Sequence, residues 1–434
     1  MTATETCRGV AAEAALGLEG DEAHGGGPVQ AYSSTEGQAG LPRYFAQAFR
    51  MARQMGRGRL DVVLPDGRRF RAEGAAPGPV AEIAVHDPDV FARLIRDGDL
   101  GFAEAYLEGG WSTPDLQGFM DLIHQGNDAI YDGFPGMGLV RAFERLRHWL
   151  RRNSRGQARR NIAHHYDLGN DFYALWLDET MTYSSALFET GQEPLDRAQR
   201  HKYGALIDRM GVRPGDHVLE IGCGWGGFAE YAASERGLRV TGVTISRAQF
   251  DHARARIRAA GLEDRVTLRL EDYRDVTGEY DAIASIEMFE AVGEDYWPTY
   301  FDALHARLKP GARAALQVIT LVEHRREVYR RSVDFIQKYI FPGGMLPTPS
   351  DLRREAARAG LAVMGSTEFG ESYSQTLRRW HETFNARWDD IAGLGFDDRF
   401  RRMWSFYLTS CAAAFHAGNC DITQITLARP VAGA

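Results

Sequence analysis

The sequence has few cysteines and no long hydrophobic run. Its four cysteines, among 434 residues, are Cys7, Cys223, Cys411 and Cys420, which lie far apart and form no CxxC pair. This spacing argues against a structural zinc site and against a disulfide framework. A transmembrane helix needs about 20 consecutive apolar residues, and no stretch of this sequence approaches that length. The first residues also lack the pattern of a secretory signal. We therefore expect a soluble, cytoplasmic protein with reduced thiols.

Positive charge is also scarce. Asp and Glu number 59 against 51 Lys and Arg, which gives a formal net charge of -8. A surface of this sign does not attract polyanions, so nucleic-acid binding has no support. The chain is long enough for two or three domains, because single cores rarely grow past about 250–300 residues.

Composition and periodicity divide the chain into four segments. Residues 1–40 are rich in Gly, Ala, Glu and Ser, and we expect a disordered tail there. Residues 41–125 show a strand, a turn and the start of a helix, which indicates a small α+β domain. The pattern does not assign its role, for which lipid binding and oligomerisation are the two expectations. Residues 126–160 are predicted to form a basic linker, and residues 161–434 a larger α/β domain.

The predicted linker is rich in arginine between residues 141 and 160, where Leu146, Trp149 and Leu150 interrupt the charge. Such a stretch could lie on an anionic membrane surface, with about 1 kcal/mol of attraction per basic residue. A solvated helix between domains explains the pattern equally well. Both interpretations stay open.

The larger domain alternates β-rich runs with helical runs. Strands are predicted at residues 217–221, 239–245, 266–270, 280–286, 312–320 and 422–427. Helices are predicted at residues 228–233, 248–259, 297–308, 352–359, 376–388 and 400–415. This alternation is typical of a doubly wound, Rossmann-like α/β sheet.

A dense glycine cluster follows the first strand of this sheet. Gly222, Gly224, Gly226 and Gly227 come directly after Glu220-Ile221 and precede a helical run. Glycines at this place let the backbone approach a ligand closely, at the carboxyl ends of the strands. A dinucleotide competes for the turn, because three of the glycines also match GxGxxG.

Three neighbouring features favour S-adenosylmethionine over a dinucleotide. The second strand ends in Val243-Thr244-Ile245-Ser246, without the acid that the ribose of a dinucleotide usually needs. Glu220 suits the methionine end of S-adenosylmethionine, and Glu271-Asp272-Tyr273 suits the adenine edge. The turn therefore predicts a methyltransferase, with NAD binding as the alternative.

Five further motifs surround the turn, in the order His165–Tyr173, Thr182–Ser185, Ser285–Glu290, Phe341–Gly344 and Tyr407–Ala412. Together they resemble the cyclopropane-fatty-acyl-phospholipid synthase and mycolic acid methyltransferase family. The resemblance implies methyl transfer from S-adenosylmethionine to a cis double bond of an unsaturated phospholipid acyl chain, through a carbocation. It also implies peripheral association with the inner face of the membrane, with a homodimer as one option.

The same resemblance places the cofactor contacts on four segments. They are Tyr183 and Ser184, then Glu220, Gly222, Cys223, Gly224, Trp225 and Gly226, then Thr244, Ile245, Ser246 and Gln249, and finally Tyr273 and Arg274.

Members of this family use a bicarbonate ion as the base, and its ligands are only partly kept here. Glu290, Tyr373 and the backbone amide of Ile319 correspond to three of them. Ser185 stands in place of a cysteine and Gln317 in place of a histidine. Because serine and glutamine still donate hydrogen bonds, an altered bicarbonate site stays an option.

Glu287 stands where many relatives have glycine, close in sequence to Glu290. If both side chains point into the pocket, one carboxyl keeps the other protonated, and either could act as the base. The alternative is a Glu287 that faces solvent or pairs with an arginine. The position of the base decides between a cyclopropane, which the family resemblance slightly favours, and a methyl-branched unsaturated chain.

The motifs also contain aromatic residues and a cysteine. Tyr183, Phe289 and Tyr373 are candidates for stabilising a carbocation, worth about 0.5–2 kcal/mol each when desolvated, or else simply line an apolar pocket. Cys411 is expected to be a packed thiol rather than a nucleophile, although its motif position makes it a site candidate. A methyltransferase for a soluble small molecule and a non-catalytic lipid-binding relative remain alternative functions.

Overall fold

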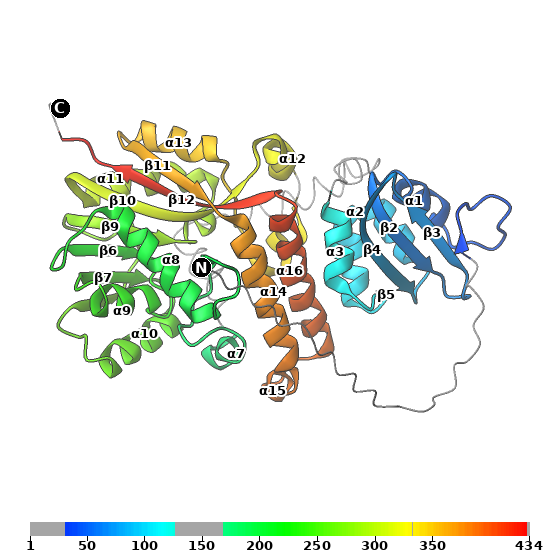
Figure 1. Ribbon diagram of the computed structural model, residues 1–434, viewed down its shortest axis with the longest axis horizontal. Helices are drawn as coiled ribbons and strands as arrows, with labels where there is room; N and C mark the ends of the chain where they lie inside the picture. Colours follow the sequence, from blue (N-terminus) through cyan, green and yellow to red (C-terminus); the bar gives the residue numbers. More distant parts are fainter. Residues whose placement is uncertain (1–30, 126–167, 332, 432–434) are drawn as a thin grey trace, which may run out of the picture.

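The computed structural model describes residues 31–125, 168–331 and 333–431. The predicted basic linker therefore lies outside the described residues, as do residues 1–30 and the first three residues of the motif at 165–173. Two β-sheets organise the described chain, and each has its own helices (Figure 1).

The amino-terminal sheet has five strands in the order β1-β3-β2-β4-β5. Their bounds are Ala31–Tyr32 for β1, Arg57–Val63 for β2, Arg69–Glu73 for β3, Ala76–Val85 for β4 and Trp111–Ser112 for β5. Three helices accompany it, α1 at Phe45–Ala52, α2 at Val90–Leu107 and α3 at Leu116–His124. The predicted small α+β unit is present in this part of the chain.

The predicted disordered tail is wrong at its carboxyl end. Residues 31 and 32 form β1, which pairs in parallel with β3. Arg68 donates hydrogen bonds to the carbonyls of Ala39 at 2.9 Å and Gly40 at 3.2 Å. These contacts come from a distant turn, so the local composition of the segment did not indicate them.

The carboxyl-terminal sheet has seven strands in the order β11-β12-β10-β9-β6-β7-β8. Their bounds are His217–Ile221 for β6, Arg239–Thr244 for β7, Val266–Leu270 for β8, Tyr280–Ile286 for β9, Leu308–Leu321 for β10, Ala362–Glu368 for β11 and Cys420–Ala428 for β12. Strands β6 to β10 pair in parallel, and β12 runs antiparallel between β10 and β11.

Helices cover both faces of this sheet, because successive residues of a strand point to opposite sides. Val218 packs with three helices on one face. They are α8 (Leu195–Met210), α9 (Gly227–Ser234) and α10 (Arg247–Ala259). Leu219 packs on the other face with α11, Trp297–Arg307, and α13, Pro349–Arg358. The doubly wound α/β fold is confirmed.

The predicted strands and helices of this domain all occur. The ends of β6, β8 and β9 are as predicted, and those of the other elements are shifted. Strand β11 was missed, because all seven of its residues are exposed and carry no hydrophobic alternation. The remaining helices are α7 at Asn170–Ala174, α12 at Arg326–Arg331, α14 at Gly370–Ala386, α15 at Trp388–Gly393 and α16 at Asp398–His416. Four short helical turns also occur in the described residues. They are η1 (Phe289–Ala291), η2 (Glu294–Tyr296), η3 (Glu323–Arg325) and η4 (Ile336–Ile340).

The two units meet where α2 and α3 pack against α16 (Figure 1). Arg378 on α14 donates two hydrogen bonds to Asp121 on α3, at 2.8 and 3.0 Å. Phe406 on α16 stacks near Tyr106 on α2. A single hydrophobic cluster therefore continues from one unit into the other. Within the described ranges, no helix is long and apolar enough to cross a membrane.

Candidate active site

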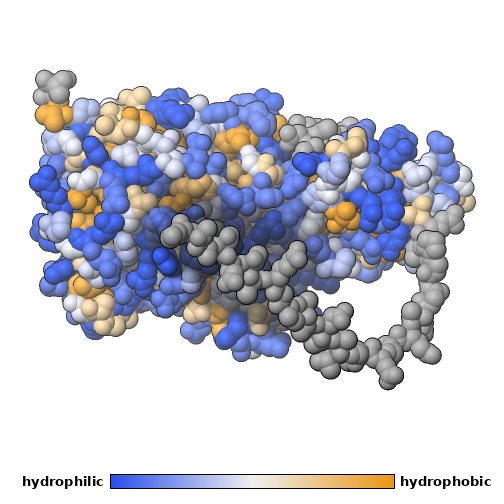
Figure 2. All heavy atoms as spheres, viewed as in Figure 1, coloured by the Kyte–Doolittle hydropathy of each residue, from blue (hydrophilic) through white to orange (hydrophobic). Residues whose placement is uncertain are grey.

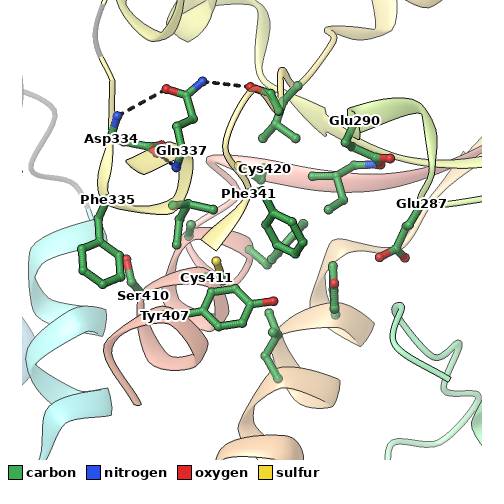
Figure 3. A pocket seen from close by; sticks show the side chains of 18 of the residues that line it. Glu287, Glu290, Asp334, Phe335, Gln337, Phe341, Tyr407, Ser410, Cys411 and Cys420 are labelled. Carbon is green, nitrogen blue, oxygen red and sulfur yellow. Dashed lines mark hydrogen bonds between the residues drawn. The ribbon is translucent and has the colours of Figure 1, made fainter. Parts of the chain in front are cut away.

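A cavity of about 650 Å³ joins the two units. Its wall includes the glycine turn after β6, the loop that carries Glu287 and Glu290, and apolar side chains of the amino-terminal unit such as Phe102 and Ile123. In Figure 3 the two glutamates lie together on one side of the cavity, and Asp334 lies on the opposite side. The long apolar wall suits a lipid chain better than a small polar molecule.

The glycine turn adopts the backbone conformation that its sequence predicts. Gly222, Gly224 and Gly226 have φ values of 84°, 51° and 87°, which glycine adopts at little cost. A Cβ atom on Gly222 would lie 2.8 Å from the side chain of Met288, whereas one on Gly224 would meet nothing within 4 Å. The turn is therefore closely packed against Met288 at Gly222 and open at Gly224.

Glu220 stands at the end of β6 beside this opening. It is 3% exposed, and among the described residues its Oε2 atom has no hydrogen-bond partner. Burial raises the pKa of Glu220 to about 8. A buried carboxyl with a free oxygen beside an open glycine turn fits the amino group of S-adenosylmethionine.

The predicted cofactor residues converge on this part of the cavity. Those in its wall are Tyr183, Ser184, Glu220, Gly222, Cys223, Gly224, Trp225, Thr244, Ile245, Gln249, Tyr273 and Arg274. Two of the predicted residues stand behind the wall instead. Gly226 is the N-cap of α9, and Ser246 is the N-cap of α10, where its hydroxyl accepts a hydrogen bond from the Gln249 amide at 3.3 Å.

Glu287 points into the site and does not face solvent or an arginine, so that alternative is wrong. Its Oε1 atom accepts hydrogen bonds from the backbone amide of Ser185 and from Nε2 of Gln317, each at 2.8 Å. Its φ value is 47°, in the left-handed region, which costs a residue other than glycine about 1–2 kcal/mol. The fold therefore holds this carboxylate in place despite backbone strain.

Glu290 lies on the turn η1, next to Glu287. Its Oε1 atom accepts a hydrogen bond from the backbone amide of Ile319, and its Oε2 atom has no partner among the described residues. Burial and the neighbouring Glu287 raise the pKa of Glu290 to about 8. Since Glu287 has more donors, we assign the charge at neutral pH to Glu287 and the proton to Glu290.

The donors expected to hold bicarbonate are already engaged. Gln317 and the Ser185 amide donate to Glu287, and the Ile319 amide donates to Glu290. The Ser185 hydroxyl donates instead to the carbonyl of Ala186, at 2.8 Å. Glu287 therefore takes the Gln317 amide, Glu290 takes the Ile319 amide, and the Ser185 hydroxyl donates elsewhere, so the residues do not fit bicarbonate.

Lys202 is a charged residue of the site that the sequence analysis missed. It is 0% exposed on α8, and its Nζ atom donates to the hydroxyl of Ser184 at 2.7 Å. Burial lowers the pKa of Lys202 to about 7, against the opposing effect of carboxylates that include Glu287 and Glu220. The sequence did contain a sign that Lys202 is buried. It lies four residues from both Ala198 and Leu206, which places the lysine on the apolar face of a helix.

The aromatic candidates separate into two groups. Tyr183 and Tyr373 line the cavity, and the Tyr183 hydroxyl lies 2.8 Å from the hydroxyl of Tyr407. Phe289 is 1% exposed and packs among aromatic residues of α11, so its predicted contact with a carbocation is wrong.

Cys411 lies in the cavity wall between the glutamates and Asp334 (Figure 3). Burial raises the pKa of its thiol well above the usual range. A neutral thiol in an apolar wall is a poor nucleophile, which agrees with the predicted packing role.

Residues 153–425 match the family described as mycolic acid cyclopropane synthetase. The chain is 42% identical over 390 residues to tuberculostearic acid methyltransferase UfaA1 of Mycobacterium tuberculosis, which covers 85% of this chain and 88% of that protein. It is 35% identical over 369 residues to the cyclopropane-fatty-acyl-phospholipid synthase of Escherichia coli, with 82% and 90% covered.

A solved structure supports the same assignment. The mycolic acid cyclopropane synthase CmaA1, complexed with SAH and CTAB, aligns with a TM-score of 0.59 and 29% identity over 62% of this chain and 97% of that one. The match spans more than half of the chain, and the glycine turn and the buried Glu220 agree with it. The chain therefore belongs to the mycolic acid cyclopropane synthetase family and is an S-adenosylmethionine-dependent methyltransferase.

Proposed function

We propose that this protein methylates a cis double bond in the acyl chain of an unsaturated phospholipid, and that Glu287 takes the proton that is then lost. The product is a methyl-branched unsaturated chain. The observation that carries the proposal is the carboxylate of Glu287, which occupies the hydrogen-bond donors of the site.

The chemistry needs one methyl donor and one base. S-adenosylmethionine, when bound, supplies an electrophilic methyl group. The π electrons of the alkene would form the new carbon–carbon bond as the methyl–sulfur bond of the donor breaks, with its electrons left on the departing neutral sulfur, and a cation would remain on the neighbouring chain carbon. Glu287 then removes a proton from a chain carbon next to the cation, and the electrons of that C–H bond form the new double bond.

The chain's own residues orient and shield these steps. Tyr183 and Tyr373 present aromatic surface to the cavity, where a desolvated cation gains about 0.5–2 kcal/mol per ring. The apolar wall excludes water, which would otherwise capture the cation. Protonated Glu290 leaves Glu287 as the carboxylate of the pair.

Two facts favour an open-chain product over the ring that the family resemblance slightly favours. Of the groups that would hold bicarbonate in ring-forming relatives, the Gln317 amide is engaged by Glu287 and the Ile319 amide by Glu290. In addition, the relative that shares 42% identity is named a methyltransferase, whereas the synthase that shares 35% is named for cyclopropane. Ring closure would require the proton to leave from the new methyl group instead.

The proposed substrate is a phospholipid at a membrane surface, reached from the cytoplasm. The apolar cavity supports a lipid chain. The face seen in Figure 2 is largely hydrophilic with scattered hydrophobic residues, which agrees with peripheral rather than embedded association. A homodimer is compatible with this proposal and is not required by it.

The test uses purified protein, labelled S-adenosylmethionine and vesicles of monounsaturated phospholipid, with and without bicarbonate. We expect a lipid product that gains one carbon, remains reducible by mild hydrogenation, and forms at the same rate without bicarbonate. A product that resists hydrogenation would show ring closure. Label in a water-soluble compound alone would support the small-molecule alternative, and free fatty acid in place of vesicles tests the phospholipid requirement.

Two variants at one position sharpen the test. Glu287→Gln keeps the side-chain shape and removes the base, so we expect activity to fall about 10²–10⁴-fold. Glu287→Gly suits the φ value of 47° and frees the donors, so added bicarbonate should restore part of its activity. A fully active Glu287→Gln variant would exclude Glu287 as the base.

A further inference from the structure

Three side chains on three different elements form a hydrogen-bonded chain that ends at Glu287. Arg209 on α8 donates through Nε to Oε1 of Gln424 on β12, at 3.1 Å. Gln424 donates through Nε2 to Oε1 of Gln317 on β10, at 3.0 Å. Gln317 donates through Nε2 to Oε1 of Glu287, at 2.8 Å. We call Arg209, Gln424 and Gln317 the amide relay.

The relay runs through the core of the sheet. Gln317 and Gln424 stand directly opposite each other in the antiparallel pairing of β10 and β12. They are 0% and 1% exposed. Two buried glutamines in a central strand pair are costly unless each amide is satisfied, and here each one is.

The direction of the relay is determined at both ends. A guanidinium group only donates, so Gln424 must present its oxygen to Arg209 and its nitrogen to Gln317. At the other end, Nε2 of Gln317 also donates to the Ser185 carbonyl at 3.2 Å, and a carbonyl only accepts. Both ends require the same orientation of the two amides.

This orientation makes the two oxygens of Glu287 unequal. Oε1 accepts two N–H groups at 2.8 Å, from Ser185 and Gln317, and neither donor can turn into an acceptor. A proton placed on Oε1 would have to compete with both. Oε2 receives neither of these two bonds, and the Tyr373 side chain also hydrogen-bonds this carboxylate.

We propose that Arg209 and Gln424 are positioning residues, which hold the amide of Gln317 as a donor and thereby make Oε2 of Glu287 the atom that receives the substrate proton. The proposal rests on the proposed function, because it concerns the base named there. In the proton transfer, the C–H electrons form the new double bond and an O–H bond forms at Oε2. No further reactant is needed.

The relay also stabilises the carboxylate form of Glu287. The N–H group of Gln317 donates to that carboxylate, and Gln317 is itself linked through Gln424 to the guanidinium of Arg209. The other titratable groups that face Glu287 are Lys202 on α8, Glu290 on η1 and Tyr373 on α14. Replacing Arg209 leaves these groups in place, whereas Gln424 also donates to the Lys202 carbonyl at 3.5 Å, so Arg209→Met is the cleaner of the two variants. Activity falls at low pH as Glu287 is protonated, and this part of the pH profile is its acidic limb. A shift of the acidic limb in a relay variant would therefore show that the relay stabilises the carboxylate of Glu287.

The experiment measures kcat/KM against pH with unsaturated phospholipid vesicles. Arg209→Met and Gln424→Met each interrupt the relay and keep side-chain volume. We expect the acidic limb to move up by about 0.5–1 pH unit, and the rate below that limb to fall about 3–10-fold. Arg209→Lys keeps a donor and a charge, so it should restore most of the wild-type profile.

Arg236→Met is the matched control. Arg236 pairs with Asp208 at 3.0 Å and does not belong to the relay, so its pH profile should equal that of the wild type. Thermal unfolding and S-adenosylmethionine affinity show whether each variant is folded. A uniform fall in rate with an unshifted acidic limb in both relay variants would overturn the proposal, because that result indicates packing alone.

Failure of the relay and failure of the proposed function give different results. If Glu287→Gln is inactive while both relay variants keep the wild-type limb, only the relay is wrong. If Glu287→Gln is active, or if the wild type requires bicarbonate, the proposed base is wrong. A Gln424→Glu variant adds a second check, because a carboxylate there pairs with Arg209 but cannot donate to Gln317, and it should shift the limb at least as far as Gln424→Met.

Discussion

Glu287 combines three features: a left-handed backbone, a carboxyl whose pKa is raised by burial, and a position on a cavity wall. Backbone strain of about 1–2 kcal/mol at a residue other than glycine persists only where surrounding contacts hold it. Here the Ser185 amide and Gln317 supply those contacts. The strain is therefore a sign of function in this family member, and it falls on the proposed base.

Lys202 offers a test of the charge balance around Glu287. Burial raises the pKa of Glu287, and the charge of Lys202 is the main opposing influence. Lys202→Met should raise the acidic limb of the kcat profile by about 1 pH unit and lower the rate on the acidic side of that limb by about 10-fold. Lys309→Met, at an exposed lysine, is the control. An unshifted limb would show that Lys202 does not act on the base.

Glu290 predicts how stability depends on pH. Its pKa is about 8 in the folded chain and about 4.3 when unfolded, so the unliganded protein loses stability as pH rises between these values. Glu290→Gln keeps the hydrogen bond from the Ile319 amide and removes the titration. We expect the variant to gain at least about 2 kcal/mol over the wild type at pH 8, and much less at pH 4.5. Urea unfolding at both pH values measures the difference.

At the scale of elements, one strand carries two parts of the site. Gln317 and Ile319 are two residues apart on β10, so they face the same side of the strand. The side-chain amide of Gln317 donates to Glu287, and the backbone amide of Ile319 donates to Glu290. Strand β12 adds Gln424 directly opposite Gln317. The loop before α13 closes over the same place, where the Met345 amide donates to the Glu290 carbonyl at 2.9 Å.

The start of α13 holds that loop. Thr348 and Asp351 form a capping box, and Arg326 donates two hydrogen bonds of 2.8 Å to Asp351. Burial opposes ionisation of Asp351, but hydrogen bonds from Arg326 and from the Thr348 amide outweigh it and lower its pKa to about 2. Its stabilisation is therefore present above about pH 4 and is lost as pH falls toward 2.

We expect Asp351→Asn to lower the free energy of unfolding by about 2 kcal/mol at pH 7 and by much less at pH 3. Thr348→Ala should cost about 1 kcal/mol at neutral pH. Denaturant unfolding measures both, with the exposed Asp389→Asn as the control. A loss for Asp351→Asn that is equal at pH 7 and pH 3 would contradict the assignment of its ionised form.

At the scale of the whole molecule, the two units share one cavity and one hydrophobic cluster. The junction is held by Arg378 with Asp121, and by Lys338 with Glu104 at 2.7 Å. The amino-terminal unit therefore contributes wall to the chamber in which the glutamates lie. This arrangement explains why a small α+β unit accompanies a methyltransferase domain.

Ile123 on α3 tests this contribution, because it lines the cavity from the amino-terminal unit. Ile123→Asn should weaken binding of a long acyl chain by about 1.5 kcal/mol, which raises KM about 10-fold and leaves kcat nearly unchanged. Ile123→Leu keeps the apolar wall and is the control. A KM that stays the same for 18-carbon chains would show that they do not reach α3.

Much of the fold followed from sequence alone, because it depends on local patterns. The period of apolar residues determined the strands β6 to β10 and the helices between them, and the glycines after β6 predicted a turn at which a ligand can approach the backbone closely. The exposed strand β11 and the ordered residues 31–40 carried no such pattern. Their pairing partners lie far along the chain, so composition could not indicate them.

The chemistry of the base was decided by tertiary structure. The sequence showed that Glu287 and Glu290 are neighbours and that Ser185 and Gln317 depart from the family. It could not show that Ser185 and Gln317 turn toward Glu287, since these residues lie 102 and 30 positions away from it. Nor could it place Lys202 or Gln424 beside them. Hydrogen bonds and charges act over a few ångströms in space, and only the folded chain brings these groups within that range.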